Sequence, residues 1–133
     1  MSFGEAIATC FRKYAVFSGR ARLSEYWYWI VFIVLVFGGL FLAAAINQVS
    51  VDEISVIAGI IGVAWLGLLV PSLAVAVRRL HDTGRSGWFL LLSCIPLIGG
   101  IILLVFLLSA GDPGVNKYGE TPSVRAQGPT PAT

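Results

Sequence analysis

The sequence predicts an all-α integral membrane protein with about three transmembrane helices and a short amphipathic interfacial helix at its amino terminus. Of its 133 residues, 57% are hydrophobic and 12% are charged, against roughly 45–50% and 25% in soluble domains. Charged residues are absent from three runs, 26–51, 54–77 and 86–111. Each run is near or above the ~20 residues with which a helix crosses a ~30 Å hydrocarbon core.

These runs predict membrane spans over residues 26–46, 54–77 and 88–109. Pro96 and the pair Gly99-Gly100 interrupt the third span. The third segment then either crosses as one kinked helix or re-enters the membrane and returns to its starting side. The pieces on either side of the break are too short to cross individually, which favours one kinked crossing.

The amino-terminal segment carries the signature of a short helix. Ser2 and Glu5 have the spacing of a capping box, and the apolar residues that follow recur on one helical face. Such a helix lies either in the membrane interface or against the helix bundle, and the sequence leaves both open. Residues 1–120 form a single helical domain, and residues 121–133, rich in Gly, Pro, Ser and Thr, are expected to be disordered.

The positive charges predict the orientation. Four basic residues precede the first span, three lie between the second and third, and the connection 47–53 has none. The positive-inside bias therefore puts the amino terminus and the segment 78–88 in the cytoplasm. Three crossings would leave the carboxyl terminus on the periplasmic side. The net charge of +2 is small, so nucleic acid is not expected as a partner.

Two basic stretches, 19–27 and 78–88, should meet at the cytoplasmic face and form the candidate site. Guanidinium groups bind phosphate and carboxylate through two parallel hydrogen bonds, so this face could hold anionic lipid headgroups. Alternatively, the arginines only fix topology and anchor the helices. Helical spacing also allows ion pairs between Arg22 and Glu25 and between Arg78 and Asp82. The candidate residues for an anion, lipid or interhelix site are Arg20, Arg22, Glu25, Arg78, Arg79, His81, Asp82 and Arg85.

No enzyme chemistry, cofactor or metal is predicted. His81 and Asp82 are neighbours in sequence and would not face each other on a helix. The chain has one histidine, and Cys10 and Cys94 lack the spacing of metal ligands.

The sequence therefore favours a noncatalytic module that binds anionic lipid or a partner protein, which could be a second copy. A small oligomeric transporter or channel component is the second hypothesis, motivated by the prolines and glycines of the spans, although no ionisable residue lies inside them. A lipid-modifying enzyme using His81 and Asp82 ranks third.

Four motifs resemble the domain-of-unknown-function family 805, the YhaH-like small bacterial inner-membrane proteins. They are GRARLSEYW at 19–27, RRLHDTGRSGW at 78–88, IPLIG at 95–99 and GVNKYG at 114–119. Leu23 stands where that family often has another basic residue. The resemblance implies a bacterial inner-membrane protein and brings no reaction, cofactor or catalytic residue.

Overall fold

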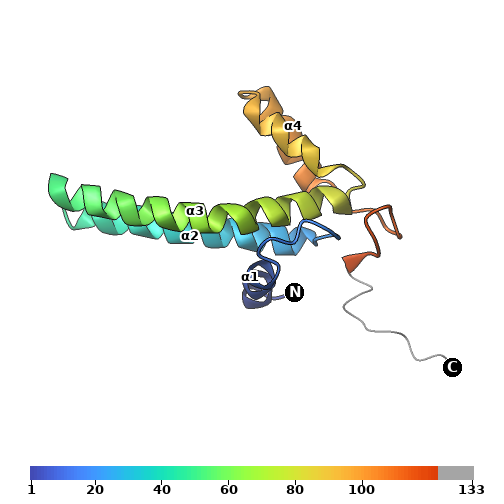
Figure 1. Ribbon diagram of the computed structural model, residues 1–133, viewed down its shortest axis with the longest axis horizontal. Coiled ribbons are helices and arrows are strands. Elements are labelled where there is room, and N and C mark those ends of the chain that lie inside the picture. The colour runs from blue at the N-terminus through green and yellow to red at the C-terminus, as the bar shows by residue number, and fades with distance from the viewer. Residues whose placement is uncertain (123–133) are drawn as a thin grey trace.

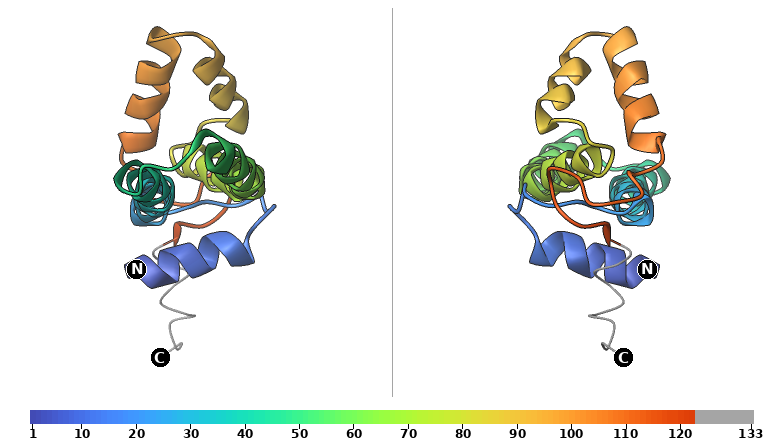
Figure 2. Two further views of the ribbon diagram at one scale, coloured as in Figure 1. Left: turned by 90° about the vertical axis from the view of Figure 1, so that its left-hand side faces the viewer. Right: turned by 90° about the vertical axis from the view of Figure 1, so that its right-hand side faces the viewer.

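The computed structural model describes residues 1–122, which form helices joined by short connections. The elements in chain order are α1 (Phe3–Arg12), α2 (Leu23–Ile46), α3 (Val51–Asp82), the 3₁₀ helix η1 (Gly87–Cys94) and α4 (Ile98–Leu108). Helices α2 and α3 run side by side, and α1 crosses them on one side while η1 and α4 stand on the other (Figures 1 and 2). The end of this pair at which α2 begins and α3 ends is the polar end of the molecule.

Two helices, α2 and α3, are long and apolar enough to cross a membrane. Both follow the charge-free runs because a helix satisfies its own backbone groups, as an apolar environment demands. At the far end, Ser50 and Glu53 form a capping box that starts α3. At the polar end α3 continues to Asp82, beyond the predicted span, so its last charged side chains project from a helix and not from a loop.

Helix α1 packs on the α2–α3 pair. Its predicted capping box is present, since the Ser2 hydroxyl accepts from the Glu5 amide while the Glu5 carboxylate accepts from the Ser2 amide. Phe11 meets Trp29 edge to face at 5.3 Å between ring centroids. Cys10 and Trp29 belong to the buried core of this contact. The structure therefore shows the bundle-packed form of this helix.

The third predicted span is not one continuous helix. Segments η1 and α4 fold back on each other as a hairpin (Figure 2). At its tip the Ile98 amide donates to the Pro96 carbonyl at 2.8 Å, and Leu97 has φ 63°, the geometry of a tight γ-turn. A Cβ on Gly99 would lie 1.8 Å from the Leu92 carbonyl oxygen, so only glycine permits this approach.

The end of α4 thus returns to the end of α3 from which η1 departs. The Arg79 guanidinium donates to the carbonyl oxygens of Leu107, at 3.1 Å, and Ser109. The prediction of one kinked helix over residues 88–109 is therefore wrong, because the segment is a hairpin of two short helices. The Asp112 amide then donates to the Asp82 carbonyl, so the chain after α4 lies at the end of α3. Pro96 and Gly99 produce the reversal, because one lacks an amide donor and the other removes a clash.

Beyond α4, residues 110–122 run back across the polar end (Figure 1). These residues are the C-terminal strap. Thr121 and Pro122, the first two residues of the predicted disordered tail, are placed with the strap, and the rest of that tail lies outside the described residues.

Candidate functional site

The carboxylate of Asp82 lies between two buried arginines. Arg20 Nε donates to Asp82 Oδ1 at 2.8 Å, and Arg79 Nη1 donates to Asp82 Oδ2. All three side chains are almost completely buried. A buried charge is tolerated when it is paired and hydrogen-bonded, as here. This arrangement joins the segment before α2, the end of α3 and, through Arg79, the end of α4.

A second buried ion pair joins α2 to α3. Arg78 Nη1 donates to Glu25 Oε1 at 2.6 Å, and neither side chain is more than 3% exposed. Within residues 1–122, Arg78 Nε and Nη2 have no hydrogen-bond partner. Burial raises the pKa of the neighbouring Cys10 thiol to about 12, so Cys10 is a protonated packing residue.

These pairs differ from the local pairs that helical spacing suggested. Glu25 binds Arg78 instead of Arg22, and Asp82 binds Arg79 and Arg20 instead of Arg78. The expectation of an exposed arginine surface is consequently wrong for Arg20, Arg78 and Arg79, which are buried. Their contacts are with Asp82, with Glu25 and with backbone carbonyl oxygens of other segments.

Arg20 also holds the C-terminal strap. Its Nη1 donates to the carbonyl oxygens of Gly114 at 2.5 Å and Gly119 at 3.3 Å, and its Nη2 donates to the Asp112 carbonyl at 2.6 Å. One guanidinium group therefore satisfies three strap carbonyls and the Asp82 carboxylate. The planar fork of arginine, with five N–H donors, suits this role, and lysine could not reproduce it.

His81 is a structural contact of the same strap. Its Nδ1 lies 3.1 Å from the Gly19 carbonyl oxygen, and because a carbonyl only accepts, Nδ1 carries the proton in this contact. The imidazole stacks on the Tyr118 ring at 3.8 Å and 4°. The Asn116 amide donates to the His81 carbonyl at 2.9 Å. His81 and Asp82 share no hydrogen bond within the described chain.

The two remaining predicted residues are half-buried. Arg22 Nη2 donates to the Pro122 carbonyl at 2.8 Å, and the Arg85 guanidinium lies 4.2 Å from the centroid of the Phe106 ring in α4. All eight predicted residues thus lie around the polar end. They contact three different parts of it: the buried ion pairs, the strap and the hairpin of η1 and α4. They do not form one surface.

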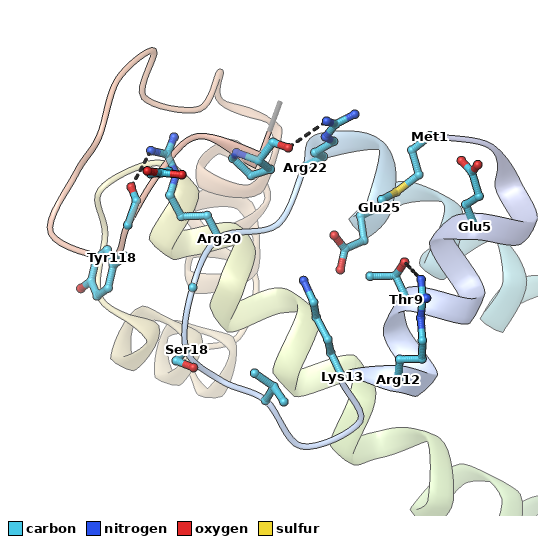
Figure 3. Close-up of a pocket in the computed structure, with 15 residues that line it drawn as sticks. Met1, Glu5, Thr9, Arg12, Lys13, Ser18, Arg20, Arg22, Glu25 and Tyr118 are labelled. Carbon is cyan, nitrogen blue, oxygen red and sulfur yellow. Dashed lines mark hydrogen bonds between the residues drawn. The ribbon is translucent and has the colours of Figure 1, made fainter. Parts of the chain in front are cut away.

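A pocket of about 840 Å³ opens between α1, the segment 18–25 and the strap. Figure 3 shows Arg12, Lys13, Arg22 and Glu25 around this space. This is the basic pocket. Its lining residues are Met1, Glu5, Thr9, Arg12, Lys13, Val16, Ser18, Gly19, Arg20, Arg22, Glu25, Tyr118, Gly119, Glu120 and Pro122.

The charge balance of the basic pocket is positive. Arg20 and Glu25 are each neutralised by a buried partner. Backbone and hydroxyl hydrogen bonds from Ser2 lower the pKa of Glu5 and hold its carboxylate at the start of α1. The lining then has three further basic side chains, those of Arg12, Lys13 and Arg22, against two carboxylates, those of Glu5 and Glu120. This leaves a site suited to an anion.

Sequence reasoning missed Arg12, Lys13, Asn116 and Tyr118 as site residues. The first two were counted only as topology signals, and the last two belong to the GVNKYG motif, whose role the sequence did not show. Among residues 1–122, no group of three or more His, Cys, Asp or Glu side chains is placed to hold a metal ion.

Two long apolar helices, with a polar assembly confined to one end, define an α-helical membrane protein. Residues 14–120 match the family described as "Protein of unknown function (DUF805)". The chain belongs to this family.

Its relatives include two inner membrane proteins of Escherichia coli (strain K12). YhaI is 40% identical over 119 residues, covering 84% of this chain and 89% of YhaI. YhaH is 39% identical over 114 residues, covering 85% of this chain and 92% of YhaH. "Uncharacterized protein YiiR" of the same strain is 30% identical over 129 residues, covering 78% of this chain and 84% of YiiR. No solved structure matches the chain.

Proposed function

We propose that the protein is a noncatalytic inner-membrane module that binds the headgroups of anionic lipids in the basic pocket. The observation that carries this proposal is the position of the pocket. It lies between an amphipathic helix and the polar end of two apolar helices, and Arg12, Lys13 and Arg22 line it. Phosphate groups of lipids are the anions present at this boundary, and each nearby basic residue adds roughly 1 kcal/mol of attraction to an anionic membrane surface.

In this proposal α2 and α3 cross the membrane and both ends of the domain face the cytoplasm. The positive-inside bias supports the cytoplasmic side for the polar end. The hairpin enters the membrane from that side. Its eight-residue η1 is about 16 Å long at ~2.0 Å per residue, and its eleven-residue α4 is about 16 Å long at ~1.5 Å per residue. Each covers about half of a ~30 Å hydrocarbon core.

The buried arginines have a different role from the pocket residues. Arg20, Arg78 and Arg79 are paired inside the protein and hold α2, α3, α4 and the strap together. A ligand reaching them would have to break ion pairs that are out of water, at a cost of about 3–5 kcal/mol each. Lipid binding is therefore assigned to Arg12, Lys13 and Arg22, the basic residues of the pocket lining other than Arg20.

A headgroup-binding experiment on the purified full chain tests the function. Short-chain phosphatidylglycerol is titrated in an uncharged detergent and binding is followed by native mass spectrometry, with short-chain phosphatidylcholine as the reference lipid. We expect preference for phosphatidylglycerol that weakens with salt. The double variant Lys13→Gln, Arg22→Gln should bind at least ~10-fold more weakly, the equivalent of two lost attractions of roughly 1 kcal/mol each.

Arg85→Gln is the matched control, because its guanidinium lies on the Phe106 ring and does not line the basic pocket. It removes one positive charge from the same end of the molecule. Equal affinity of the wild type and the pocket variant, or an equal loss in Arg85→Gln, would overturn the proposed function.

A further inference from the structure

We propose that the C-terminal strap is a lid whose docking is coupled to occupancy of the basic pocket. This inference rests on the proposed function and adds the regulation of the same site. The strap supplies one side of the pocket through Tyr118, Gly119, Glu120 and Pro122, next to Arg20 of the segment 18–25, and α1 supplies the facing side. Figure 3 shows Tyr118 and Arg20 on one side of the open space and Thr9 and Arg12 of α1 on the other.

Besides the three hydrogen bonds from Arg20, polar contacts with the end of α3 hold the strap. Asp112 N–H donates to the Asp82 carbonyl at 2.8 Å, and the Asn116 side chain donates to the His81 carbonyl and to Asp112 Oδ2, both at 2.9 Å. The ring of Tyr118 lies on the imidazole of His81. These contacts define the latch.

Little apolar burial reinforces the latch. Val115 is 77% exposed, and the buried core of the molecule contains no strap residue among those described. Segments with few buried apolar contacts open at lower free energy than the helices they cover. The strap can therefore detach while α2 and α3 stay paired.

Two basic residues bind the segment before α2 to the strap at the edge of the pocket. Arg20 and Arg22 extend from the segment before α2 to carbonyls of Gly119 and Pro122. A headgroup that touches both the strap and α1 binds the pocket more tightly when the strap is docked than when it is detached. Binding must then shift the strap toward the docked state, and docking must raise affinity by the same factor.

Hydrogen exchange measures the first half of this coupling. The amide of Asp112 donates to the Asp82 carbonyl in α3, a bond that exists only while the strap is docked. At saturating short-chain phosphatidylglycerol, exchange of a peptide covering 110–120 should slow at least ~5-fold, within the usual range of coupling between sites. A peptide within α3 serves as the internal reference and should not change.

The variant Asn116→Ala measures the second half. Asn116 does not line the basic pocket and carries no charge, so its loss weakens the latch without removing a lipid contact. We expect at least a ~5-fold loss of phosphatidylglycerol affinity. Val115→Ala, an exposed neighbour in the same strap, should bind as the wild type does.

The outcomes separate the two proposals. Saturable lipid binding with unchanged exchange in the strap, or with full affinity in Asn116→Ala, overturns the coupling and leaves the proposed function standing. Absence of phosphatidylglycerol binding by the wild type overturns both. If Asn116→Ala does not fold, the exchange experiment on the wild-type chain decides alone.

Discussion

The hydroxyl of Tyr14 donates a hydrogen bond to the backbone carbonyl of Gly67 in α3. Gly67 is four residues before Pro71, which lies inside α3 and has no amide hydrogen. The carbonyl that the helix leaves without a donor is thus satisfied by a side chain from the connection after α1. This contact ties α1 to α3 and explains how a proline is accommodated inside an apolar helix.

Tyr14→Phe should therefore destabilise the protein, and the loss should depend on Pro71. The Gly67 carbonyl lies at an exposed position of α3, so the lost hydrogen bond should cost about 0.5–1.5 kcal/mol. In a Pro71→Ala background the backbone regains an amide hydrogen that can donate to the Gly67 carbonyl, so Tyr14→Phe should cost less there. Unfolding free energies of the four chains in mild detergent measure this coupling.

Tyr28→Phe is the matched control, since no hydrogen bond of the Tyr28 hydroxyl is present in the described part of the chain. Equal losses from Tyr14→Phe with and without Pro71 would contradict this account.

Removing one partner of the Glu25–Arg78 ion pair should destabilise the protein more than replacing both partners with apolar residues. Glu25→Gln leaves Arg78 buried without a counter-charge, for which about 3–5 kcal/mol is expected. The double variant Glu25→Leu, Arg78→Met removes both charges and should recover much of that loss. Thermal unfolding in detergent compares them, with Arg85→Gln expected within about 0.5 kcal/mol of the wild type. A double variant less stable than Glu25→Gln would argue against this interpretation.

Gly111 should tolerate no side chain, whereas Gly114 should. A Cβ on Gly111 would lie 2.1 Å from Asp82 Oδ2, and the space around a Cβ on Gly114 is open. Arg20 and Arg79 hold the Asp82 carboxylate from both sides, so it cannot move away. Gly111→Ala should cost about 1–3 kcal/mol, as overpacking does. The midpoint of thermal unfolding checks the pair, and equal midpoints would exclude this clash.

Cys10 should resist alkylation in the folded protein. With a pKa of about 12, its thiolate fraction at pH 8 is about one in ten thousand, and the thiolate is the nucleophile. In a Cys94→Ala background, maleimide should modify Cys10 at least ~100-fold more slowly than a Ser18→Cys thiol in a chain lacking both native cysteines. Both should react equally in denaturant. Rapid modification of native Cys10 would show that α1 does not stay packed.

The hairpin topology predicts that residues 18 and 115 share one side of the membrane. The single-cysteine variants Ser18→Cys and Val115→Cys should react with a membrane-impermeant maleimide only after the cytoplasmic side is opened. Gln48→Cys, in the connection between α2 and α3, should react in intact spheroplasts. If Val115→Cys also reacted in intact spheroplasts, residue 115 would lie on the same side as residue 48, and a third crossing would be required.

The sequence predicted α2 and α3 because uncharged runs of this length have few alternatives. It favoured one kinked crossing for the third segment, although Pro96 and Gly99 are compatible with a kink and with a reversal. Only the backbone at Leu97 distinguishes the two, and its positive φ has no sequence signature outside glycine.

The arginine cluster was predicted in position but not in burial. Helical spacing reveals partners three or four residues away, whereas Arg78 and Glu25 are 53 residues apart and Arg20 and Asp82 are 62 apart. Long-range pairing of this kind follows from helix packing. The pocket was missed for the same reason, because its walls come from α1 and from the strap, at opposite ends of the chain.

The reach of Arg20 has a consequence for biosynthesis. Its guanidinium group is completed by the carbonyl of Gly119, 99 residues later. Helices α2 and α3 can pair while the ribosome is still translating. The last acceptor of Arg20, the Gly119 carbonyl, is made only when almost the whole family domain has been translated. In a newly made chain, α2 and α3 are therefore complete before the residues that close the polar end have been translated.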